Sequence, residues 1–370
     1  MKQIGALGVA LLLLLFLSVP TFAKAKGMVL IDGKNGRVLF EENKDERLPM
    51  ASTTKIMTAL LALEEQDLDF PFVVDKNAIR VEGSSMGLSE DDTVTLRALV
   101  TGMLLSSGND AANAAAVRIA GTLSAFVKKM NERAALLGMS NTRFQTPSGL
   151  DAEGHYSSAY DMAILAKEAL KNPDFAKICA KSKESVVFGD PPRKQWLSNH
   201  NRLLKELLGA TGVKTGFTKK AGRCLVSSAE RDGVALICVT LGCPDDWETH
   251  TALYERFFQE LSAVDMEKKV PAVVLPVTGG VTKGVSLAAE PVKASLRREE
   301  EKKIKVVLST EPFLFAPVEK GQTVGKARFY LEDVLIAETV LKTKYPVPEK
   351  SEDRTWIQKQ KDQWMPRSNQ

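Results

Sequence analysis

The sequence predicts an α/β (α+β) domain, in which helices flank an antiparallel sheet, followed by a small all-β domain. Three observations lead to this fold class. The chain has 370 residues, which exceeds one ordinary domain, and 44% of them are hydrophobic, enough for sizeable cores. Residues 26–263 show a strand pair, a block of helices, three strands and a last helix. Residues 264–346 alternate apolar and polar side chains, with glycine and proline between the runs.

The first 25 residues predict a secretory signal peptide. Lys2 precedes an uncharged run to Ala23 that includes the leucines at 11–15, and small residues stand at Ala23 and Ala25. The alternative is an uncleaved anchor, because the apolar run is nearly long enough to span a bilayer. Pro20 and the small residues favour cleavage. Both alternatives place the rest of the chain outside the cytoplasm, in the cell-wall space or periplasm.

The first folded domain is predicted element by element. Residues 28–32 and 37–40 form a hairpin around turn residues 32–36. A helix capped by Ser158 should stop near Asn172 and Pro173. If the N-terminal hairpin joins the three later strands, the result is an antiparallel sheet with helices on both faces. The other expected helices are 53–65, 96–105, 110–120, 123–137 and 247–261, and the later strands are 212–217, 223–229 and 234–241.

The all-β domain is expected to contain strands at 272–275, 281–287, 304–308, 326–334 and 336–341, with a charged turn at 297–303. Residues 347–370 form a polar tail. Trp356 and Trp364 could share one helical face there, which makes peripheral membrane contact through the tail one reading. A disordered or loosely packed tail is favoured, because the apolar face is short.

Composition excludes several classes of function. Fifty basic residues against 46 acidic ones give a formal net charge of +4, without the concentrated basic face of a nucleic-acid binder. The four cysteines have no metal-ligand spacing and the chain has three histidines, so no metal site is expected. Cys224 and Cys238 flank a turn at 231–233 and could face each other across a hairpin. Buried thiols are the favoured reading.

The first motif is S-T-T-K at residues 52–55, at the start of a predicted helix. Side chains three residues apart share a helical face, so the amine of Lys55 can reach the hydroxyl of Ser52. Burial and the helix dipole should lower the lysine pKa and let the neutral amine accept the serine proton. An isolated motif would favour the alternative, in which Ser52 caps the helix and Lys55 is solvated.

The second motif is S-G-N at residues 107–109, between two predicted helices, where a short loop can face a cleft. The hydroxyl of Ser107 can pass a proton to a leaving amine. The amide of Asn109 can bind a substrate carbonyl or hold Lys55. The alternative, compatible with this reading, is that Ser107 or Asn109 caps the following helix.

The third motif is K-T-G at residues 214–216, on a strand expected to border the cleft. Lys214 supplies positive charge and Thr215 a hydroxyl for a substrate carboxylate. Gly216 has no side chain, so a peptide could lie along the strand and pair with it. The backbone N–H groups of Phe217 and Ser52 are candidate donors to an oxyanion. The alternative is an exposed edge strand with a polar start.

In this order and spacing, the three motifs resemble those of the D-alanyl-D-alanine carboxypeptidases, low-molecular-mass penicillin-binding proteins with a β-lactamase-like catalytic domain. The resemblance extends over residues 28–261 and a β-rich C-terminal domain. Further segments that carry it are 49–59, 83–86, 149–151 and 156–159.

The resemblance implies that Ser52 is the acylated nucleophile and Lys55 its general base, with Ser107 and Asn109 in the second motif. The implied reaction removes the terminal D-alanine from peptidoglycan stem pentapeptides, needs no metal or organic cofactor, and is inhibited covalently by β-lactams. Two positions depart from the family pattern. Phe217 and Ser148 stand where members often carry histidine. Phe217 could alter deacylation or substrate preference.

Three rival functions remain open at this stage. A class A β-lactamase shares the motif logic, but no E-x-x-L-N string stands between the second and third motifs. An endopeptidase that cuts crosslinks between stems is a second rival. A non-catalytic wall-binding or antibiotic-sensing protein is the third, although all the proposed catalytic side chains are present.

Overall fold

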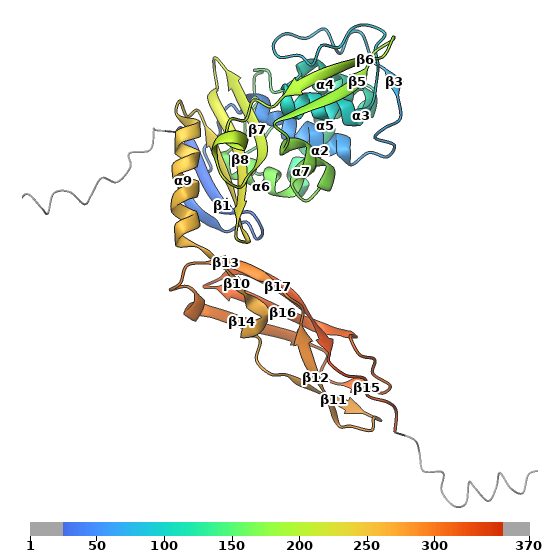
Figure 1. The fold of residues 1–370 in the computed structure, drawn as a ribbon, viewed down its shortest axis with the longest axis vertical. Helices are drawn as coiled ribbons and strands as arrows, with labels where there is room; N and C mark the ends of the chain where they lie inside the picture. The colour runs from blue at the N-terminus through green and yellow to red at the C-terminus, as the bar shows by residue number, and fades with distance from the viewer. Residues whose placement is uncertain (1–24, 351–370) are drawn as a thin grey trace, which may run out of the picture. The chain divides into compact units, whose positions relative to one another are not determined.

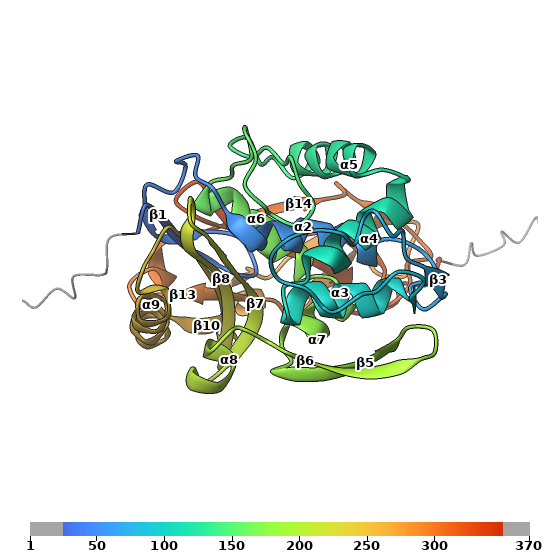
Figure 2. The ribbon, with the colours of Figure 1, turned by 90° about the horizontal axis from the view of Figure 1, so that it is seen from above.

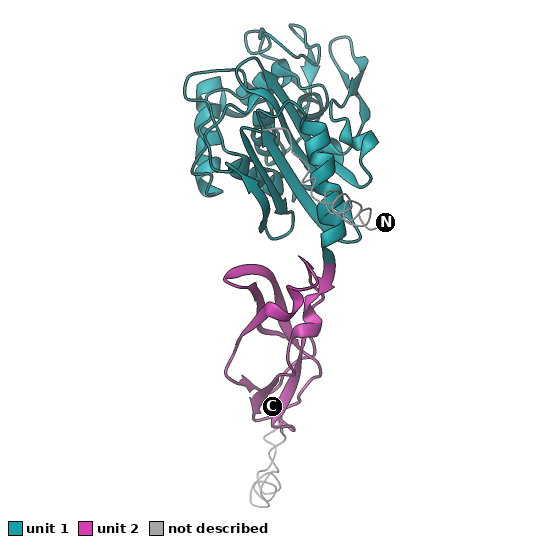
Figure 3. Ribbon diagram, turned by 90° about the vertical axis from the view of Figure 1, so that its left-hand side faces the viewer, with its two compact units in different colours: residues 1–262 teal, residues 263–370 magenta. Residues whose placement is uncertain are grey.

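The computed structural model describes residues 25–350. The chain forms two compact units and passes from one to the other between Ser262 and Ala263 (Figure 3). The predicted signal peptide, apart from Ala25, and tail residues 351–370 lie outside the described part. Within residues 25–350, no helix is both long and apolar enough to cross a membrane.

The first unit is built on a five-stranded antiparallel sheet with the strand order β2-β1-β9-β8-β7 (Figure 1). Strand β1 pairs with β9 in register from Gly27 opposite Leu241 to Asp32 opposite Leu236. This pairing confirms that the N-terminal hairpin joins the later strands. Strand β7, which carries the K-T-G motif, lies at one edge of the sheet. The strands are β1 (Gly27–Asp32), β2 (Val38–Glu42), β7 (Ala210–Thr218), β8 (Gly222–Arg231) and β9 (Val234–Leu241).

Helices cover both faces of this sheet. Helix α9 packs against β8 and β9 on one face, and α6 packs against β1 and β9 on the other (Figure 2). On β8, Val226 belongs to the core beneath the helical block, whereas the neighbouring Ser227 bonds to His250 and Tyr254 of α9. Side chains alternate between the two faces of a strand, so one strand supports both layers. The helices are α2 (Lys55–Leu63), α3 (Leu96–Leu105), α4 (Asn109–Ala120), α5 (Leu123–Leu136), α6 (Ala159–Ala169), α7 (Pro173–Cys179), α8 (Leu203–Glu206) and α9 (Asp246–Glu260).

Some elements of the first unit differ from the prediction. The expected helix stop at Asn172 and Pro173 is also the start of α7. The side chain of Asn172 accepts hydrogen bonds from Asp174 and Phe175, and proline is tolerated in a first turn because its N–H would have no helical partner there. Helix α8 and two hairpins were not predicted. The hairpins are β3 (Phe72–Val73) with β4 (Thr93–Val94), and β5 (Lys183–Phe188) with β6 (Arg193–Ser198).

The second unit contains a six-stranded sheet with the order β14-β16-β17-β12-β11-β15, and a small β10–β13 pair. The expected strand at 326–334 is wrong at its end, because Glu332 adopts a φ of 55° and the chain turns before Val334. The strands are β10 (Ser262–Asp265), β11 (Val274–Thr278), β12 (Gly284–Ala289), β13 (Lys293–Leu296), β14 (Ile304–Thr310), β15 (Leu314–Phe315), β16 (Thr323–Leu331) and β17 (Val334–Thr343). The short 3₁₀ turns are η2 (Met266–Lys269) and η3 (Glu301–Lys303).

The four cysteines are free and buried. Cys224 pairs across the sheet with Leu241, and Cys238 pairs with Ser227, so the two cysteines are not cross-strand neighbours. The hairpin reading is therefore wrong and the buried-thiol reading is confirmed. Burial raises the pKa of the Cys224 thiol to about 12, which keeps it protonated.

Candidate active site

The S-T-T-K motif begins with a tight turn that was not predicted. Residues Ala51–Thr54 form the 3₁₀ turn η1, and α2 begins at Lys55. Ala51 adopts a φ of 48°, and the hydroxyl of Thr54 donates to its carbonyl at 2.8 Å. Neither cap of η1 or α2 uses a serine side chain. The alternative reading of Ser52 as a helix cap is therefore wrong.

Lys55 is completely buried and its amine meets three oxygen atoms. Its Nζ lies 2.9 Å from Ser52 Oγ, 2.7 Å from Asn109 Oδ1 and 2.5 Å from the carbonyl oxygen of Ser148. Burial lowers the pKa of Lys55 well below its ordinary value, and the charge of Lys214 lowers it further. A neutral amine has two N–H donors and one lone pair. Two oxygens can take the donors, and the lone pair is then free for the proton of Ser52.

The second motif holds the lysine in place. Asn109 is the first residue of α4, and the cap before it is Gly108, so the reading of Ser107 or Asn109 as a cap is wrong. The amide of Asn109 donates through Nδ2 to the carbonyl of Glu82 at 2.6 Å while Oδ1 faces Lys55. Both ends of the amide are occupied, which favours the expected role of holding Lys55 over binding a substrate carbonyl.

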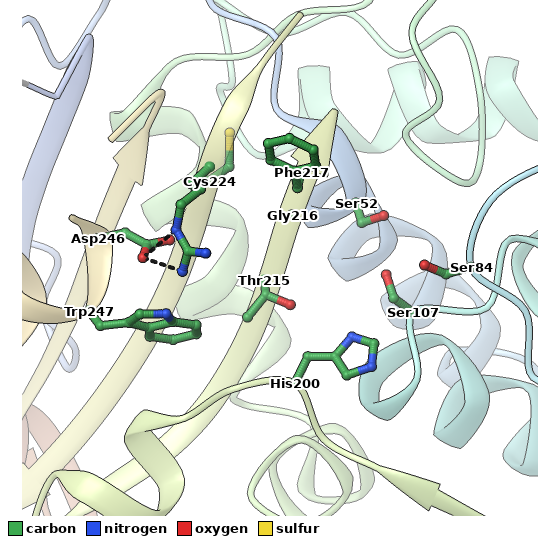
Figure 4. Close-up of a pocket in the computed structure, with 11 residues that line it drawn as sticks. Ser52, Ser84, Ser107, His200, Thr215, Gly216, Phe217, Cys224, Asp246 and Trp247 are labelled. Carbon is green, nitrogen blue, oxygen red and sulfur yellow. Dashed lines mark hydrogen bonds and ion pairs between the residues drawn. The ribbon is translucent and has the colours of Figure 1, made fainter. Parts of the chain in front are cut away.

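The same loop fixes the segment around Ser84 at the edge of the site. The N–H of Asn109 donates to the carbonyl of Ser84 at 2.7 Å. Asp110 accepts hydrogen bonds from the N–H of Met86 at 2.9 Å and from the hydroxyl of Ser85 at 2.5 Å. Ser107 adopts a φ of 60°, a strained backbone conformation for a serine. Figure 4 shows the hydroxyls of Ser52, Ser84 and Ser107 turned toward the same part of the cleft.

The third motif packs directly against the 3₁₀ turn that contains Ser52. A Cβ atom placed on Gly216 would lie 3.0 Å from the nitrogen of Ser52 and 3.1 Å from the carbonyl oxygen of Met50. Such distances are tighter than ordinary contacts, so glycine is needed for the approach of β7 to the turn. The sequence predicts glycine at 216 because a bound peptide needs room beside the strand. The close approach of β7 to the turn is a second requirement for glycine at this position.

The other residues of this motif differ in exposure. Lys214 is buried, its Nζ donates to the carbonyl of Thr215 at 2.8 Å, and burial lowers its pKa to about 7. Phe217 is 66% exposed, at the mouth of the cleft.

His155 contacts the 3₁₀ turn that contains Ser52, and it was not predicted as a site residue from the sequence. Its Nδ1 accepts from the N–H of Gln145 at 2.9 Å, which places the ring proton on Nε2, 2.9 Å from the hydroxyl of Thr54. Burial lowers the pKa of His155 to about 4, so the ring is neutral near pH 7. Tyr156 and Ser157, which follow it, belong to a segment that carries the resemblance to the family. This resemblance was the one signal in the sequence that drew attention to the segment around His155.

The comparison with protein families identifies the family to which a chain with these three motifs belongs. A family model described as D-alanyl-D-alanine carboxypeptidase matches residues 17–245, and one described as penicillin-binding protein 5, C-terminal domain, matches residues 268–349. The chain belongs to the D-alanyl-D-alanine carboxypeptidase family. This membership confirms the family resemblance and the fold class, and it makes the chain a serine-type hydrolase. It also removes the β-lactamase rival, since the β-rich C-terminal domain is matched as well.

Individual carboxypeptidases agree with this assignment. The D-alanyl-D-alanine carboxypeptidase DacF of Bacillus subtilis is 36% identical over 332 residues, which cover 87% of this chain and 85% of that protein. DacC of Escherichia coli is 36% identical over 337 residues, with coverage of 86% and 82%. The crystal structure of penicillin-binding protein 5 from Haemophilus influenzae is similar with a TM-score of 0.68 and 29% identity, and covers 89% of this chain and 99% of that one.

The cleft of this carboxypeptidase has a volume of about 290 Å³. Residues from all three motifs line it, namely Ser52, Ser107, Thr215, Gly216 and Phe217. Lys55, Asn109 and Lys214 lie behind these residues. Six further lining residues were not predicted as site residues, and they are Ser84, His200, Arg223, Cys224, Asp246 and Trp247.

Proposed function

We propose that the chain removes the terminal D-alanine from peptidoglycan stem pentapeptides through an acyl-enzyme on Ser52. The observation that carries this proposal is the position of Lys55, a buried amine with a lowered pKa at 2.9 Å from the hydroxyl of Ser52. A serine becomes nucleophilic when a neutral base lies within hydrogen-bond distance. The membership in the carboxypeptidase family supports the substrate class.

In the acylation step, Ser52 Oγ attacks the carbonyl carbon of the penultimate D-alanine while its proton passes to the amine of Lys55. The backbone N–H groups of Ser52 and Phe217 stabilise the negative oxygen of the tetrahedral intermediate. The C–N bond then breaks. Ser107 gives its hydroxyl proton to the leaving amine of D-alanine and takes up the proton that Lys55 accepted, so the amine of Lys55 is neutral again. Water then attacks the ester carbon; its hydroxyl group stays on the acyl product, and its proton returns to Ser52 Oγ through Lys55.

The peptide lies along the edge strand β7 in this proposal. An edge strand has unpaired backbone groups that an extended peptide can use. Gly216 and Thr215 face the cleft, and the charge of Lys214 behind them favours an anionic substrate. β-Lactams acylate the same serine because they present an amide carbonyl to the same position.

The proposed location is outside the cytoplasm, where peptidoglycan is found. The residues that carry the signal-peptide prediction, 1–24, lie outside the described part of the chain. Contact of the tail with a membrane stays a prediction for the same reason.

The test is release of D-alanine from an N-acylated peptide ending in L-Lys-D-Ala-D-Ala. Purified protein from Lys26 onward is compared with the Ser52→Ala variant. Release that requires Ser52 supports the carboxypeptidase function. Retained release in the Ser52→Ala variant contradicts the mechanism. Stable labelling by a fluorescent penicillin without release would instead favour an endopeptidase or a sensor.

A further inference from the structure

The segment from Glu82 to Asp92 makes contacts on which the active site depends. The carbonyl of Glu82 accepts from Nδ2 of Asn109 at 2.6 Å, while Oδ1 of the same amide lies 2.7 Å from the amine of Lys55. Ser84 lines the cleft, and its carbonyl accepts from the N–H of Asn109 at 2.7 Å. Because Glu82 and Lys55 hold the two ends of one amide, the position of this segment determines which end of the amide faces the lysine.

Helix α4 holds the middle of the segment. The carboxylate of Asp110 accepts from the N–H of Met86 at 2.9 Å and from those of Gly87 and Leu88, both at 3.1 Å. These bonds fix residues 86–88. The end of the segment is held from a different element, the hairpin β5–β6.

The anchor on that hairpin is Arg193, the first residue of β6. Its Nη1 and Nη2 donate to Oδ1 and Oδ2 of Asp92, each at 2.6 Å, in the paired geometry that suits a guanidinium and a carboxylate. Nη2 also donates to the carbonyl of Gly87 at 2.9 Å. One guanidinium therefore ties Gly87 and Asp92 together and joins both to the hairpin.

The contact between Arg193 and Asp92 differs from a surface ion pair. The side chain of Asp92 is 4% exposed, and it also accepts from the N–H of Ser89 at 2.7 Å. The hydrogen bonds from Arg193 lower the pKa of Asp92, which keeps the carboxylate ionised. The guanidinium carbon lies 4.5 Å from the ring centre of Phe188, the cross-strand partner of Arg193. Both charged groups are thus held in place by further contacts.

The turn of the hairpin is shaped around this pair. Gly189 adopts a φ of 107°, and a Cβ atom there would lie 3.2 Å from Oδ1 of Asp92 and closer still to the guanidinium of Arg193. The N–H of Gly189 donates to the carbonyl of Thr93 at 2.8 Å. Side-chain and backbone contacts therefore join the hairpin to the 82–92 segment at the same place.

We propose that Arg193 and Asp92 are positioning residues for the reaction, which hold the 82–92 segment so that the Asn109 amide presents its oxygen to Lys55. The inference rests on the proposed function, in which Lys55 is the base. Neither Arg193 nor Asp92 lines the cleft, so the two act through the segment.

Release of the segment would disturb the base. Nδ2 of Asn109 would lose the carbonyl of Glu82 as its acceptor, and an amide that turns over presents an N–H to the amine of Lys55. This N–H competes with the hydroxyl of Ser52 for the lone pair of the neutral amine. Acylation should therefore slow in a protein that is still folded.

The measurement is the second-order rate constant for acylation by benzylpenicillin, at a temperature where thermal unfolding shows each variant to be folded. Arg193→Gln removes the paired bonds to Asp92. A misplacement of about 1 Å can cost about 100-fold in rate, and we expect a loss of about 10- to 100-fold. Arg193→Lys keeps the charge without the paired geometry, so it should restore only part of the rate.

A second background separates positioning from a general loss of structure. Asn109→Ala removes the amide through which Arg193 is proposed to act. In that background, Arg193→Gln should change the acylation rate by less than about twofold, because the coupling between the two residues is gone. A merely structural role predicts a loss by the same factor in both backgrounds.

Arg80→Gln is the matched control. Arg80 pairs with Glu90 of the same segment, but the two side chains are 65% and 48% exposed. Exposed ion pairs contribute little, so this variant should stay within about twofold of the wild-type rate. If Arg193→Gln does not fold, Asp92→Asn takes its place, because it keeps the volume of the buried side chain and leaves Arg193 in contact with solvent. It should show the same loss and the same dependence on Asn109.

The outcomes separate this inference from the function on which it rests. An unchanged rate in Arg193→Gln or its replacement Asp92→Asn, or an equal loss in both backgrounds, would overturn the inference. A loss that disappears in the Asn109→Ala background supports it. A wild-type protein that is acylated but releases no D-alanine would overturn the proposed function and leave this test in force. A wild-type protein that is not acylated would overturn both.

Discussion

Lys55 Nζ lies 2.9 Å from Ser52 Oγ, although the two residues belong to different helical segments. The 3₁₀ turn holds Ser52, and α2 begins at Lys55 itself. Asn109 and the carbonyl of Ser148 hold the amine from the other side. The pair is therefore positioned by contacts from three separate parts of the chain.

Replacement of the base should abolish fast acylation. Lys55→Arg keeps a positive charge but cannot accept a proton near pH 7, because the guanidinium does not lose its own. General-base catalysis contributes about 100- to 10,000-fold, and a loss in this range is expected in the second-order rate constant for acylation by benzylpenicillin. An Arg variant that acylates within about tenfold of the wild-type rate would show that Lys55 is not the base.

Replacement of Lys214 should change the pH dependence of acylation. The neutral form of Lys55 is the active one, so acylation rises with pH as Lys55 loses its proton. The charge of Lys214 helps to lower the pKa of Lys55. Lys214→Gln removes this charge, so the pKa of Lys55 rises and the ascending limb of the pH–rate profile moves to higher pH.

The rate of acylation by a chromogenic cephalosporin, measured against pH, gives this profile for the wild-type protein and for the Lys214→Gln variant. The pKa of Lys214 is about 7, so its charge and its influence are largest below that pH. A limb that stays in place, or that moves to lower pH, would contradict the coupling between the two lysines.

Gly216→Ala should displace the 3₁₀ turn that contains Ser52. The added Cβ would lie 3.0 Å from the nitrogen of Ser52 and 3.1 Å from that of Thr53. Crowding of this kind costs about 1–3 kcal/mol of stability, and a displaced nucleophile loses about 100-fold in rate. Thermal unfolding and the acylation rate measure the two effects.

Gly121→Ala is the control for this substitution. Gly121 has a φ of 76° and nothing within 4 Å of its Cβ position, and it caps α4 at the end opposite to Asn109. It should lose stability through backbone strain but keep its acylation rate. Equal acylation losses in both variants would mean that the contact with Ser52 is not what requires glycine at 216.

The hydrogen bond between His155 and Thr54 should stabilise the 3₁₀ turn, and His155 should take no direct part in the reaction. Thr54→Val removes the oxygen that accepts from His155 and donates to the carbonyl of Ala51. The donor left unpaired costs about 1–3 kcal/mol, and acylation should fall with it. Thr54→Ser keeps the oxygen and should restore both quantities. If Thr54→Val behaves like Thr54→Ser, the hydroxyl does not hold the turn.

Ser148→Ala is expected to have little effect. Ser148 touches Lys55 through its backbone carbonyl, so the side chain at this position is not what holds the amine. We expect an acylation rate within about threefold of wild type, because no charged hydrogen bond is removed. A tenfold loss would show that the serine hydroxyl takes part.

Part of this site could be predicted from the sequence because its residues lie close together within short motifs. Ser52 and Lys55 are three residues apart, and Asn109 follows a short loop between two helices. Spacing predicts that the side chains of Ser52 and Lys55 lie on one helical face. That the three motifs form one site was implied by the resemblance to the family. The 3₁₀ turn before α2 was missed, since its shape depends on the packing of Gly216 and Gly149 against Ala51 and its neighbours.

Long-range contacts account for the remaining errors. His155 is 101 residues from Thr54, and no pattern in the sequence links the two side chains. Arg223 and Asp246 meet because β8 and the start of α9 lie side by side, which only the packed sheet determines. The hairpin β5–β6 has an exposed outer face that includes Trp196, so it lacks the regular alternation by which strands are recognised.

The most direct test of the central claim is identification of the acylated residue. The protein is incubated with benzylpenicillin, digested, and analysed by mass spectrometry. The account predicts one penicilloyl group per chain, on the peptide that contains Ser52, and none in the Ser52→Ala variant. A penicilloyl group on another residue, or an unmodified Ser52 peptide in a protein that still releases D-alanine, would contradict it.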